Sequence, residues 1–262
     1  MPVQWRDGRT ILRAMTLDWK KDRRFFSTEE RIKHAVIPPR LYLRNLAWRR
    51  GRKGEKELRL LSALVEPGRT AIDIGANKGV YSYALSPLCN RVMAFEPNPK
   101  MFHLLTAAVP GNVETFEVAL SNAAGEAELI LPIQRSGRFS NQGATLQAKK
   151  LDGDKAFETM TVAQKPLDSY DFRDVSFIKI DVEGFEMEVI DGARETLARE
   201  RPTLLVEIDA HHAKIPVADA IAEIGNHGYS CFYMSRTSLK PYSAFEADTR
   251  RTHTDNFIFL PV

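Results

Sequence analysis

The sequence predicts an α/β protein built on a doubly wound, mostly parallel β-sheet. Short apolar segments of strand length alternate with longer segments of helical periodicity, which is the pattern of repeated strand–helix–strand units. Four of the apolar segments end in an acid, namely Asp73, Glu96, Asp181 and Glu207. Because sheets of this kind take ligands beyond the carboxyl ends of their strands, we expect the functional site at these acids.

The elements follow in order from turn signals and periodicity. Helices are expected at 28–36 and 40–50, on either side of Pro38-Pro39, and at 54–66, which Pro67-Gly68 ends before a strand at 70–74. A helix at 79–87, a strand at 91–96 and a helix at 99–108 come next. The apolar and β-branched segment at 113–120 is then expected to be the third strand of the sheet, and 126–131 is expected to be a further strand.

The second half begins with a polar stretch, 132–156, that has three glycines and no clear period. We expect a lid or substrate loop there, with Arg135, Arg138, Asn141 and Gln142 available to meet a substrate. Strands at 175–181 and 203–208 and helices at 187–197 and 216–226 continue the alternation. The final strands, 229–234 and 256–260, are expected to form an antiparallel hairpin at the edge of the sheet.

Composition places the chain among ordinary globular proteins, with 262 residues of which 44% are apolar and 27% charged. Its two cysteines, Cys89 and Cys231, are far apart and form no CxxC pair, which argues against a disulfide framework or a structural zinc site. The sequence shows neither an apolar run of membrane-spanning length nor an apolar signal core at its start. We therefore expect a cytoplasmic protein.

Positive charge is concentrated at the start of the chain. Residues 1–70 hold 18 Lys and Arg against 8 Asp and Glu, whereas the rest holds 19 against 26. We divide the chain into a basic, aromatic-bearing helical arm at 1–53 and a catalytic domain at 54–262. The arm would lie on an anionic membrane surface, bind an acidic or phosphorylated glycan, or simply pack its aromatic side chains on the domain. Nucleic acid is a weaker alternative because no nucleic-acid-binding motif accompanies the charge.

The stretch from Asp73 to Gly79 predicts a cofactor site. Its pattern is D-x-G-x-x-x-G, in which Gly75 and Gly79 permit backbone angles that a side chain would forbid. Glu96 follows Asp73 by 23 residues, close to the spacing of about 20 that places a carboxylate on ribose hydroxyls. An acid in place of the first glycine of a dinucleotide fingerprint disfavours a diphosphate and suits S-adenosylmethionine. Asp73 would then face the amino-acid end, and Leu120-Ser121 would flank the adenine.

Several motifs together resemble one family. The segments DIGANKGVYS, AFEPNP, VALSNAAGEAEL, LDSY, FIKIDVEGFEMEVIDGA and DNFIF are similar to those of the FkbM-type S-adenosylmethionine-dependent methyltransferases, over roughly residues 55–260. The resemblance implies a Rossmann-like, class I methyltransferase fold with a seven-stranded sheet, and O-methylation of sugars or related natural products. It carries the cofactor-binding role onto Asp73, Gly75, Asn77, Gly79, Glu96, Ser121 and Asp181.

Candidates for the proton-accepting group lie at the ends of the last two parallel strands: Asp181, Glu183, Glu207, His211 and His212. Lys179 alternates with apolar neighbours and is expected to be structural. An alternative for Asp181, Glu207 and one histidine is a divalent cation site, although a histidine suits Mg²⁺ poorly, and we predict no metal. The other functions left open are an NAD-dependent oxidoreductase and a non-catalytic cofactor-binding protein recruited by its basic arm.

Overall fold

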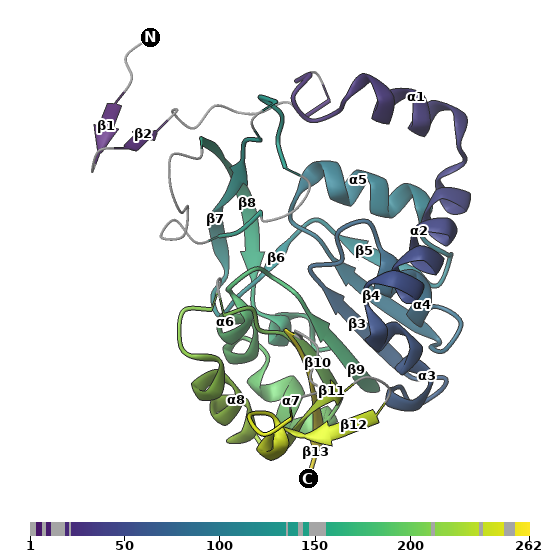
Figure 1. Cartoon of the computed structure of the whole chain (residues 1–262), viewed down its shortest axis with the longest axis vertical. Helices are drawn as coiled ribbons and strands as arrows, with labels where there is room; N and C mark the ends of the chain where they lie inside the picture. Colours follow the sequence, from purple (N-terminus) through teal and green to yellow (C-terminus); the bar gives the residue numbers. More distant parts are fainter. Residues whose placement is uncertain are drawn as a thin grey trace.

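The main sheet of the protein has eight strands. The computed structural model describes residues 4–6, 9–11, 19–20, 22–134, 136–140, 144–146, 156–210, 213–235, 238–248 and 255–262. In spatial order the strands are β12 (Ser238–Pro241), β11 (Tyr229–Ser235), β13 (Asn256–Pro261), β10 (Thr203–Glu207), β9 (Val175–Ile180), β3 (Thr70–Ile74), β4 (Arg91–Phe95) and β5 (Val113–Phe116) (Figure 1).

The predicted doubly wound, mostly parallel arrangement is confirmed. Strands β5, β4, β3, β9 and β10 run parallel, and the chain order reverses direction between β3 and β9. The predicted antiparallel pair at the C-terminal edge is also present, because β11 pairs antiparallel with β13. Strand β13 lies between β10 and β11 rather than outermost, and β12 adds a further antiparallel strand at the edge.

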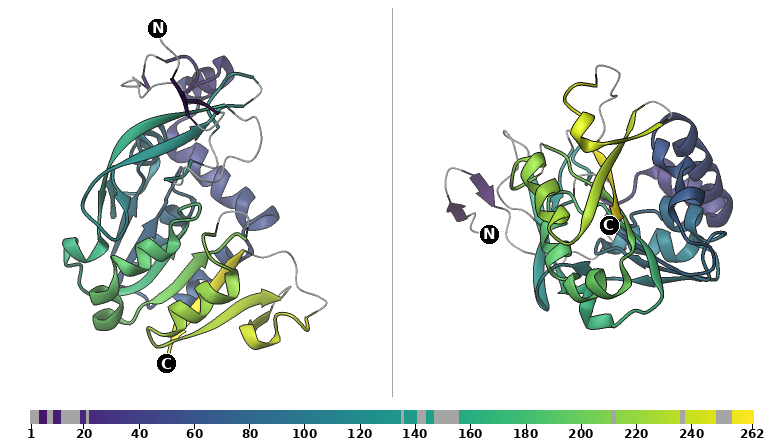
Figure 2. Two further views of the ribbon diagram at one scale, coloured as in Figure 1. Left: turned by 90° about the vertical axis from the view of Figure 1, so that its left-hand side faces the viewer. Right: turned by 90° about the horizontal axis from the view of Figure 1, so that it is seen from below.

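Helices cover both faces of this sheet. Side chains at alternate strand positions point to opposite faces, so Val92 packs with Leu61 and Tyr81, whereas Met93 packs in the cluster that contains Val189. One face is covered by α3 (Leu61–Leu64), α4 (Val80–Leu85) and α5 (Pro99–Ala108), and the other by α6 (Glu186–Asp191), α7 (Arg194–Glu200) and α8 (Val217–Gly225) (Figures 1 and 2).

A second, three-stranded sheet corrects part of the sequence prediction. It contains β6 (Ala119–Leu120), β8 (Phe157–Lys165) and β7 (Gly125–Pro132), in that order. The expected strand at 113–120 is therefore two strands in different sheets, and the strand expected at 126–131 is present as β7 of this second sheet. Strand β8 was not expected. Apolar periodicity identifies a strand but carries no information about its pairing partner, which explains these errors.

Two expected helices are interrupted. The helix predicted at 54–66 is a short 3₁₀ turn, η1 (Lys56–Arg59), followed by α3. The helix predicted at 187–197 is divided into α6 and α7 at Gly192, where a Cβ would lie 2.0 Å from the backbone oxygen of Ser121. The remaining short elements are β1 (Gln4–Arg6), β2 (Arg9–Ile11), η3 (Leu167–Tyr170) and η4 (Tyr242–Ala244).

The N-terminal region contains the two predicted helices, α1 (Thr28–Val36) and α2 (Pro39–Lys53). Helix α2 packs against α5 and the turn after β3 through Leu43, which is 1% exposed and clusters with Ala76 and Leu105. Before α1, Phe25 packs in the cluster on the three-stranded sheet, and its carbonyl accepts a hydrogen bond from Lys100 Nζ. The division of the chain between residues 53 and 54 stays a prediction. Among the described helices, none combines the length and apolarity that a membrane span needs.

Candidate functional site

A cavity of about 850 Å³ opens at the carboxyl ends of β3, β4, β9 and β10. It is lined by the turn after β3, by Glu96 after β4, and by residues 181–183 and Glu207 at the ends of β9 and β10. Helix α2 contributes Leu46 and Arg50, and the segment after β7 contributes Gln134, Ser140 and residues 144–146. The expectation that the strand-end acids converge is thus fulfilled geometrically.

The turn after β3 requires its two glycines for different physical reasons. Gly75 has φ +77°, and a Cβ on it would lie 1.7 Å from the backbone oxygen of Asp181, so the ends of β3 and β9 approach closely there. Gly79 has φ +87°, and its Cβ would lie 2.6 Å from Leu105 Cδ1. Gly75 lines the cavity, whereas Gly79 allows α4 to pack on α5. The glycine at 79 is therefore explained by helix packing.

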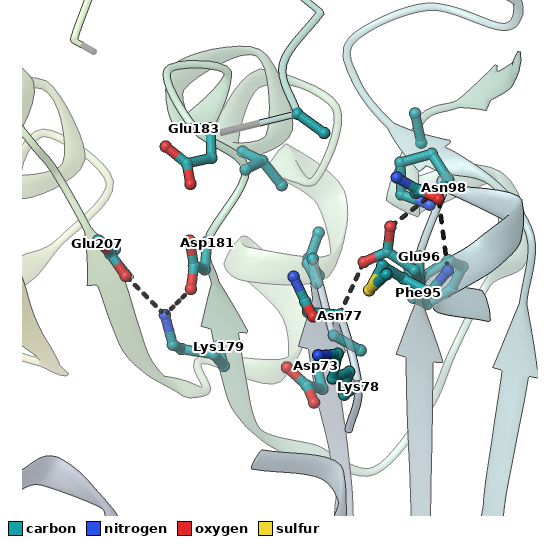
Figure 3. A pocket seen from close by; sticks show the side chains of 18 of the residues that line it. Asp73, Asn77, Lys78, Phe95, Glu96, Asn98, Lys179, Asp181, Glu183 and Glu207 are labelled. Atoms are coloured by element: carbon teal, nitrogen blue, oxygen red, sulfur yellow. Dashed lines mark hydrogen bonds and ion pairs between the residues drawn. The ribbon is translucent and has the colours of Figure 1, made fainter. Parts of the chain in front are cut away.

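Glu96 is held by the two loops beside it. Its carboxylate accepts backbone N–H hydrogen bonds from Asn77 at 2.7 Å and from Asn98 at 2.8 Å (Figure 3). The residue is 6% exposed and still lines the cavity. Burial raises the pKa of Glu96 to about 7, against the effect of these two N–H donors, which favour the carboxylate.

Asp73 lies beneath the turn and is bonded from within the protein. It is 2% exposed, and its Oδ2 accepts a hydrogen bond of 2.5 Å from Ser82 Oγ on α4. Burial raises the pKa of Asp73 to about 6, opposed by the Ser82 hydrogen bond and by the nearby Lys179 ammonium. This carboxylate thus fixes the start of α4 relative to β3 while contributing to the cavity wall.

The other side of the cavity contains a lysine between two carboxylates. Lys179 Nζ lies 3.4 Å from Asp181 Oδ2 and 3.9 Å from Glu207 Oε2 (Figure 3). The lysine is 1% exposed, and its ammonium lies 5.1 Å from the centre of the Tyr81 ring. Lys179, expected from the sequence to be structural, lines the cavity beside two of the predicted catalytic acids, and its role stays a prediction.

The protonation states of this cluster depend on one another. Burial lowers the pKa of Lys179, but Asp181 and Glu207 outweigh that effect and leave it above its ordinary value, so the ammonium is charged. Burial and the neighbouring Asp181 carboxylate raise the pKa of Glu207 to about 8, although Lys179 opposes the shift. A carboxyl group that titrates near neutral pH is therefore directed into the cavity.

The remaining predicted residues are distributed unequally. Asn77 and Glu183 line the cavity, and the Glu183 carbonyl accepts a hydrogen bond of 2.8 Å from Thr145 Oγ1. Ser121 is buried and does not line the cavity, whereas its neighbour Leu120 does. The backbone N–H of Ser121 donates a hydrogen bond of 3.0 Å to the Lys165 carbonyl, next to the three-stranded sheet.

Other expected residues fall partly outside the described part of the chain. His211, His212, Arg135, Asn141 and Gln142 lie outside the described residues. Arg138 is described, and it is exposed and does not line the cavity. Within the described ranges, no group of three or more His, Cys, Asp and Glu residues is arranged to hold a metal ion. Lys179 supplies positive charge between Asp181 and Glu207, so these two acids do not need a metal for charge balance.

The sequence did not single out several residues that line the cavity, among them Leu46, Arg50, Tyr81 and Thr145. Tyr81 follows Gly79 by two residues, so its place near the site was available from the sequence. Leu46 and Arg50 come from α2, which is distant from the motifs along the chain, whereas Thr145 belongs to the 132–156 stretch in which a lid or substrate loop was expected.

The fold and the site define the class. A doubly wound sheet with the strand order 5-4-3-9-10 and a cavity at the carboxyl ends, beside the point where the order reverses, is typical of α/β proteins that bind nucleoside-containing ligands. The chain belongs to the FkbM methyltransferase family, because the model of the methyltransferase FkbM domain matches residues 73–231, more than half of the sequence. This family membership sets aside the NAD-dependent oxidoreductase alternative.

A curated relative and several solved structures resemble the chain. Hexuronic acid methyltransferase AglP of Haloferax volcanii is 33% identical over 171 residues, which cover 62% of this chain and 66% of the relative, just under two thirds. A crystal structure of an FkbM methyltransferase from Methylobacillus flagellatus is 15% identical with a TM-score of 0.47, covering 74% of this chain and 43% of that one. A putative methyltransferase of Streptococcus mutans in complex with SAH is 12% identical with a TM-score of 0.43, covering 78% and 93%.

Proposed function

We propose that the protein transfers a methyl group from S-adenosylmethionine to a hydroxyl group of a sugar or sugar-containing acceptor. The observation that carries the proposal is that one cavity combines a glycine turn beside the buried Glu96 with the Lys179, Asp181 and Glu207 cluster. The first group suits a nucleoside cofactor, and the second suits removal of a proton. Membership of the FkbM methyltransferase family supports the reaction class, and the name of the AglP relative supports a sugar acceptor.

The residues of the β3–β4 side fit S-adenosylmethionine. Gly75 allows β3 to approach β9 closely and lines the cavity, and the Glu96 carboxylate reaches the cavity while being fixed by two N–H donors. In our proposal Glu96 binds the ribose hydroxyls, since a carboxylate can accept from both at once. Asn77 and the Gly75 backbone lie along the cofactor, and Leu120 flanks the adenine in place of Ser121. Asp73 and Asp181 provide negative charge for the amino group.

The reaction needs a group that removes the hydroxyl proton. When bound, S-adenosylmethionine supplies a methyl group already activated by its positively charged sulfur. Glu207 is our choice of general base because its pKa of about 8 lies close to neutral pH, where proton transfer by a carboxylate is most effective. It accepts the acceptor's proton as the new oxygen–carbon bond forms and the carbon–sulfur bond breaks. The roles suggested for Glu183, His211 and His212 stay predictions.

Lys179 positions the base. Its ammonium lies within 3.9 Å of both Asp181 and Glu207, so it keeps two carboxylates together that would otherwise repel each other. The Lys179 side chain is 1% exposed, so solvent ions cannot readily replace its ammonium beside the two carboxylates. Its charge also limits how far the pKa of Glu207 rises.

An acidic sugar suits the cations that line the cavity from the α2 side. Arg50 and the half-buried Lys78 both line it, and burial lowers the pKa of Lys78; Glu30 opposes this shift, whereas Lys33 and Arg50 add to it. A carboxylate on the acceptor would relieve this repulsion. We therefore propose a hexuronic acid as acceptor, and Lys78→Met should weaken its methylation more than that of the matching neutral hexose.

The Glu207→Gln variant tests the assignment. Loss of the general base should lower the methylation rate by about a hundredfold or more and remove the rise in rate through pH 8. Calorimetric affinity for S-adenosylhomocysteine should change little, because Glu207 lies on the acceptor side. Glu195→Gln, on an exposed residue of α7, is the matched control. An unchanged pH profile in Glu207→Gln would remove Glu207 from this role.

The cofactor is tested separately. Calorimetry of the intact protein should show binding of S-adenosylhomocysteine and none of NAD, and Glu96→Ala should weaken that binding. Failure of both adenosyl ligands to bind would contradict the proposed function as a whole. Cofactor binding without turnover on any sugar acceptor would instead favour the non-catalytic alternative.

A further inference from the structure

Exposed apolar side chains gather on helices α1 and α2. Among the described residues, seven large hydrophobic side chains are exposed, and five of them belong to residues 32–48. These five are Ile32, Val36, Ile37, Leu41 and Trp48. The other two, Leu239 and Val262, are in β12 and at the last residue of the chain. Such a concentration is typical of an interaction surface and not of scattered exposed side chains.

Helix α1 has its apolar side chains on its solvent-exposed side and its polar and aromatic side chains toward the rest of the protein. None of its residues is buried, all nine being described. Its inward contacts are polar or aromatic: Glu30 pairs with Lys100 at 3.4 Å, and the His34 ring lies 5.5 Å from that of Tyr42. Ile32 lies two residues from both Glu30 and His34, about 160° away around the helix axis, and Val36 lies about 160° from His34 and 120° from Glu30. The apolar side of α1 therefore faces away from the protein, at 60% and 74% exposure for Ile32 and Val36.

Helix α2 continues the same surface. Leu43 is on its buried side, and Leu41 and Trp48 lie about 140–160° away from it around the helix axis. The guanidinium of Arg52 lies 4.8 Å from the centre of the Trp48 ring. Figure 1 shows α1 and α2 along two adjoining outer edges of the molecule, so the Pro38-Pro39 corner between them projects outward.

This surface is strongly basic. Residues 28–53 contain eight Lys and Arg against two Asp and Glu. Arg31, Lys33, Arg40 and Arg44 are exposed next to the apolar side chains. The same helix α2 contributes Leu46 and Arg50 to the wall of the cavity. Leu46 and Arg50 lie about 140–180° around the helix axis from Leu41 and Trp48, so α2 separates the cavity from the basic, apolar surface.

We propose that this α1–α2 surface, made of the five apolar side chains and the adjacent cations, binds the surface of an anionic lipid bilayer. Apolar side chains beside Arg and Lys match the boundary between acyl chains and negative headgroups, whereas nucleic acid would use the charges and the Trp48 ring but leave the four exposed aliphatic side chains without an apolar partner. A second copy would bring two equally basic surfaces together. The inference goes beyond the proposed methyl transfer and does not depend on it.

Vesicle flotation with the full chain tests the proposal. We expect binding to phosphatidylcholine vesicles that contain phosphatidylglycerol, little binding to phosphatidylcholine alone, and weakening as salt is raised. Ile32→Asp with Val36→Asp should reduce partitioning by about tenfold or more, the equivalent of removing buried aliphatic side chains from the bilayer. Charge reversal at Arg31, Arg40 and Arg44 should reduce it by about a hundredfold or more.

The matched control is Leu239→Asp, which changes the exposed leucine of β12 and should leave vesicle binding unaltered. Thermal unfolding should be alike in all variants, because every substituted side chain is exposed. Trp48 fluorescence should shift to the blue with anionic vesicles, and Trp48→Phe should abolish the shift. Equal effects of Leu239→Asp, no flotation with anionic vesicles, or burial of Trp48 in a dimer or on RNA instead would each overturn the proposal.

Discussion

The two sides of the cavity hold their carboxylates in different ways. On the β3–β4 side, Glu96 and Asp73 are fully buried and are bonded by uncharged donors: two backbone N–H groups and the Ser82 hydroxyl. On the β9–β10 side, Asp181 and Glu207 have side chains that are 34% and 37% exposed and share the ammonium of Lys179. The carboxylates of the β3–β4 side are held by hydrogen bonds from neighbouring uncharged groups. The arrangement of the two carboxylates on the β9–β10 side depends on their interaction with the Lys179 ammonium.

This difference teaches how one cavity divides its tasks. Groups fixed by short hydrogen bonds keep one geometry, which suits binding of a cofactor whose shape does not change. Carboxylates held by a shared cation change their pKa whenever one charge changes, which suits proton transfer. We expect substitutions on the β3–β4 side to alter cofactor affinity and stability, and those of Lys179 and Glu207 on the β9–β10 side to alter rate and pH profile.

The largest effect should come from Gly75→Ala, where the two sides meet. A methyl group at this position would lie 1.7 Å from the Asp181 carbonyl oxygen at a φ of +77°, so β3 and β9 would have to separate. We expect loss of adenosyl-ligand binding and a marked fall in the unfolding temperature, measured by calorimetry and circular dichroism. Gly111→Ala has open space around its Cβ and is the control. Similar behaviour of the two variants would contradict the close approach.

Lys179→Met should have the next largest effect and should distinguish the roles of the two sides of the cavity most clearly. Without the ammonium, the pKa of Glu207 should rise further, because the lysine opposes its upward shift. The methylation rate at neutral pH should fall by about a hundredfold, with the alkaline limb displaced to higher pH. Lys179→Arg should restore part of the rate, and affinity for S-adenosylhomocysteine should be largely kept. A lower rate with an unmoved limb would indicate a purely structural lysine.

The Leu43→Ala variant tests whether helix α2 stabilises the β3–β4 side of the cavity. This side chain is 1% exposed and packs with Ala76 and Leu105, so its removal should cost about 2–4 kcal/mol of unfolding free energy. Leu41→Ala, at 47% exposure on the opposite side of the helix, should cost less than about 0.5 kcal/mol. Denaturant titration measures both. Equal costs would mean that α2 is not part of the core.

Glu96→Gln should remove a pH dependence of stability that develops between about pH 4.5 and 7. The pKa of Glu96 rises from 4.5 to about 7 on folding, so the folded state holds the proton more tightly. Its stabilising contribution is complete below about pH 4.5 and is lost as pH rises through 7, a change of up to about 3 kcal/mol. The variant should flatten this decline in denaturant titrations between pH 5 and 8, whereas Glu114→Gln, on an exposed residue, should not. An equally steep decline in Glu96→Gln would assign the effect elsewhere.

The sequence by itself determined the parallel sheet, the glycine turn, the convergence of Asp73, Glu96, Asp181 and Glu207, and the family. These features are local: strand periodicity, glycines at required angles and acids at strand ends are written within short segments. It failed where partners are distant along the chain, because the pattern at 113–120 cannot say that β5 and β6 enter different sheets.

Only the tertiary structure decided the rest. In the folded protein Lys179 lies between two carboxylates, and Gly79 allows α4 to pack on α5. Ser121 does not line the cavity, whereas Arg50 of α2 does. The tertiary structure also showed that Ile32 and Val36 point outward, which the helical spacing of α1 alone leaves open. The physical reason is common to all of them: burial, pKa and exposure depend on which remote segments pack around a side chain, and that is a property of the folded chain.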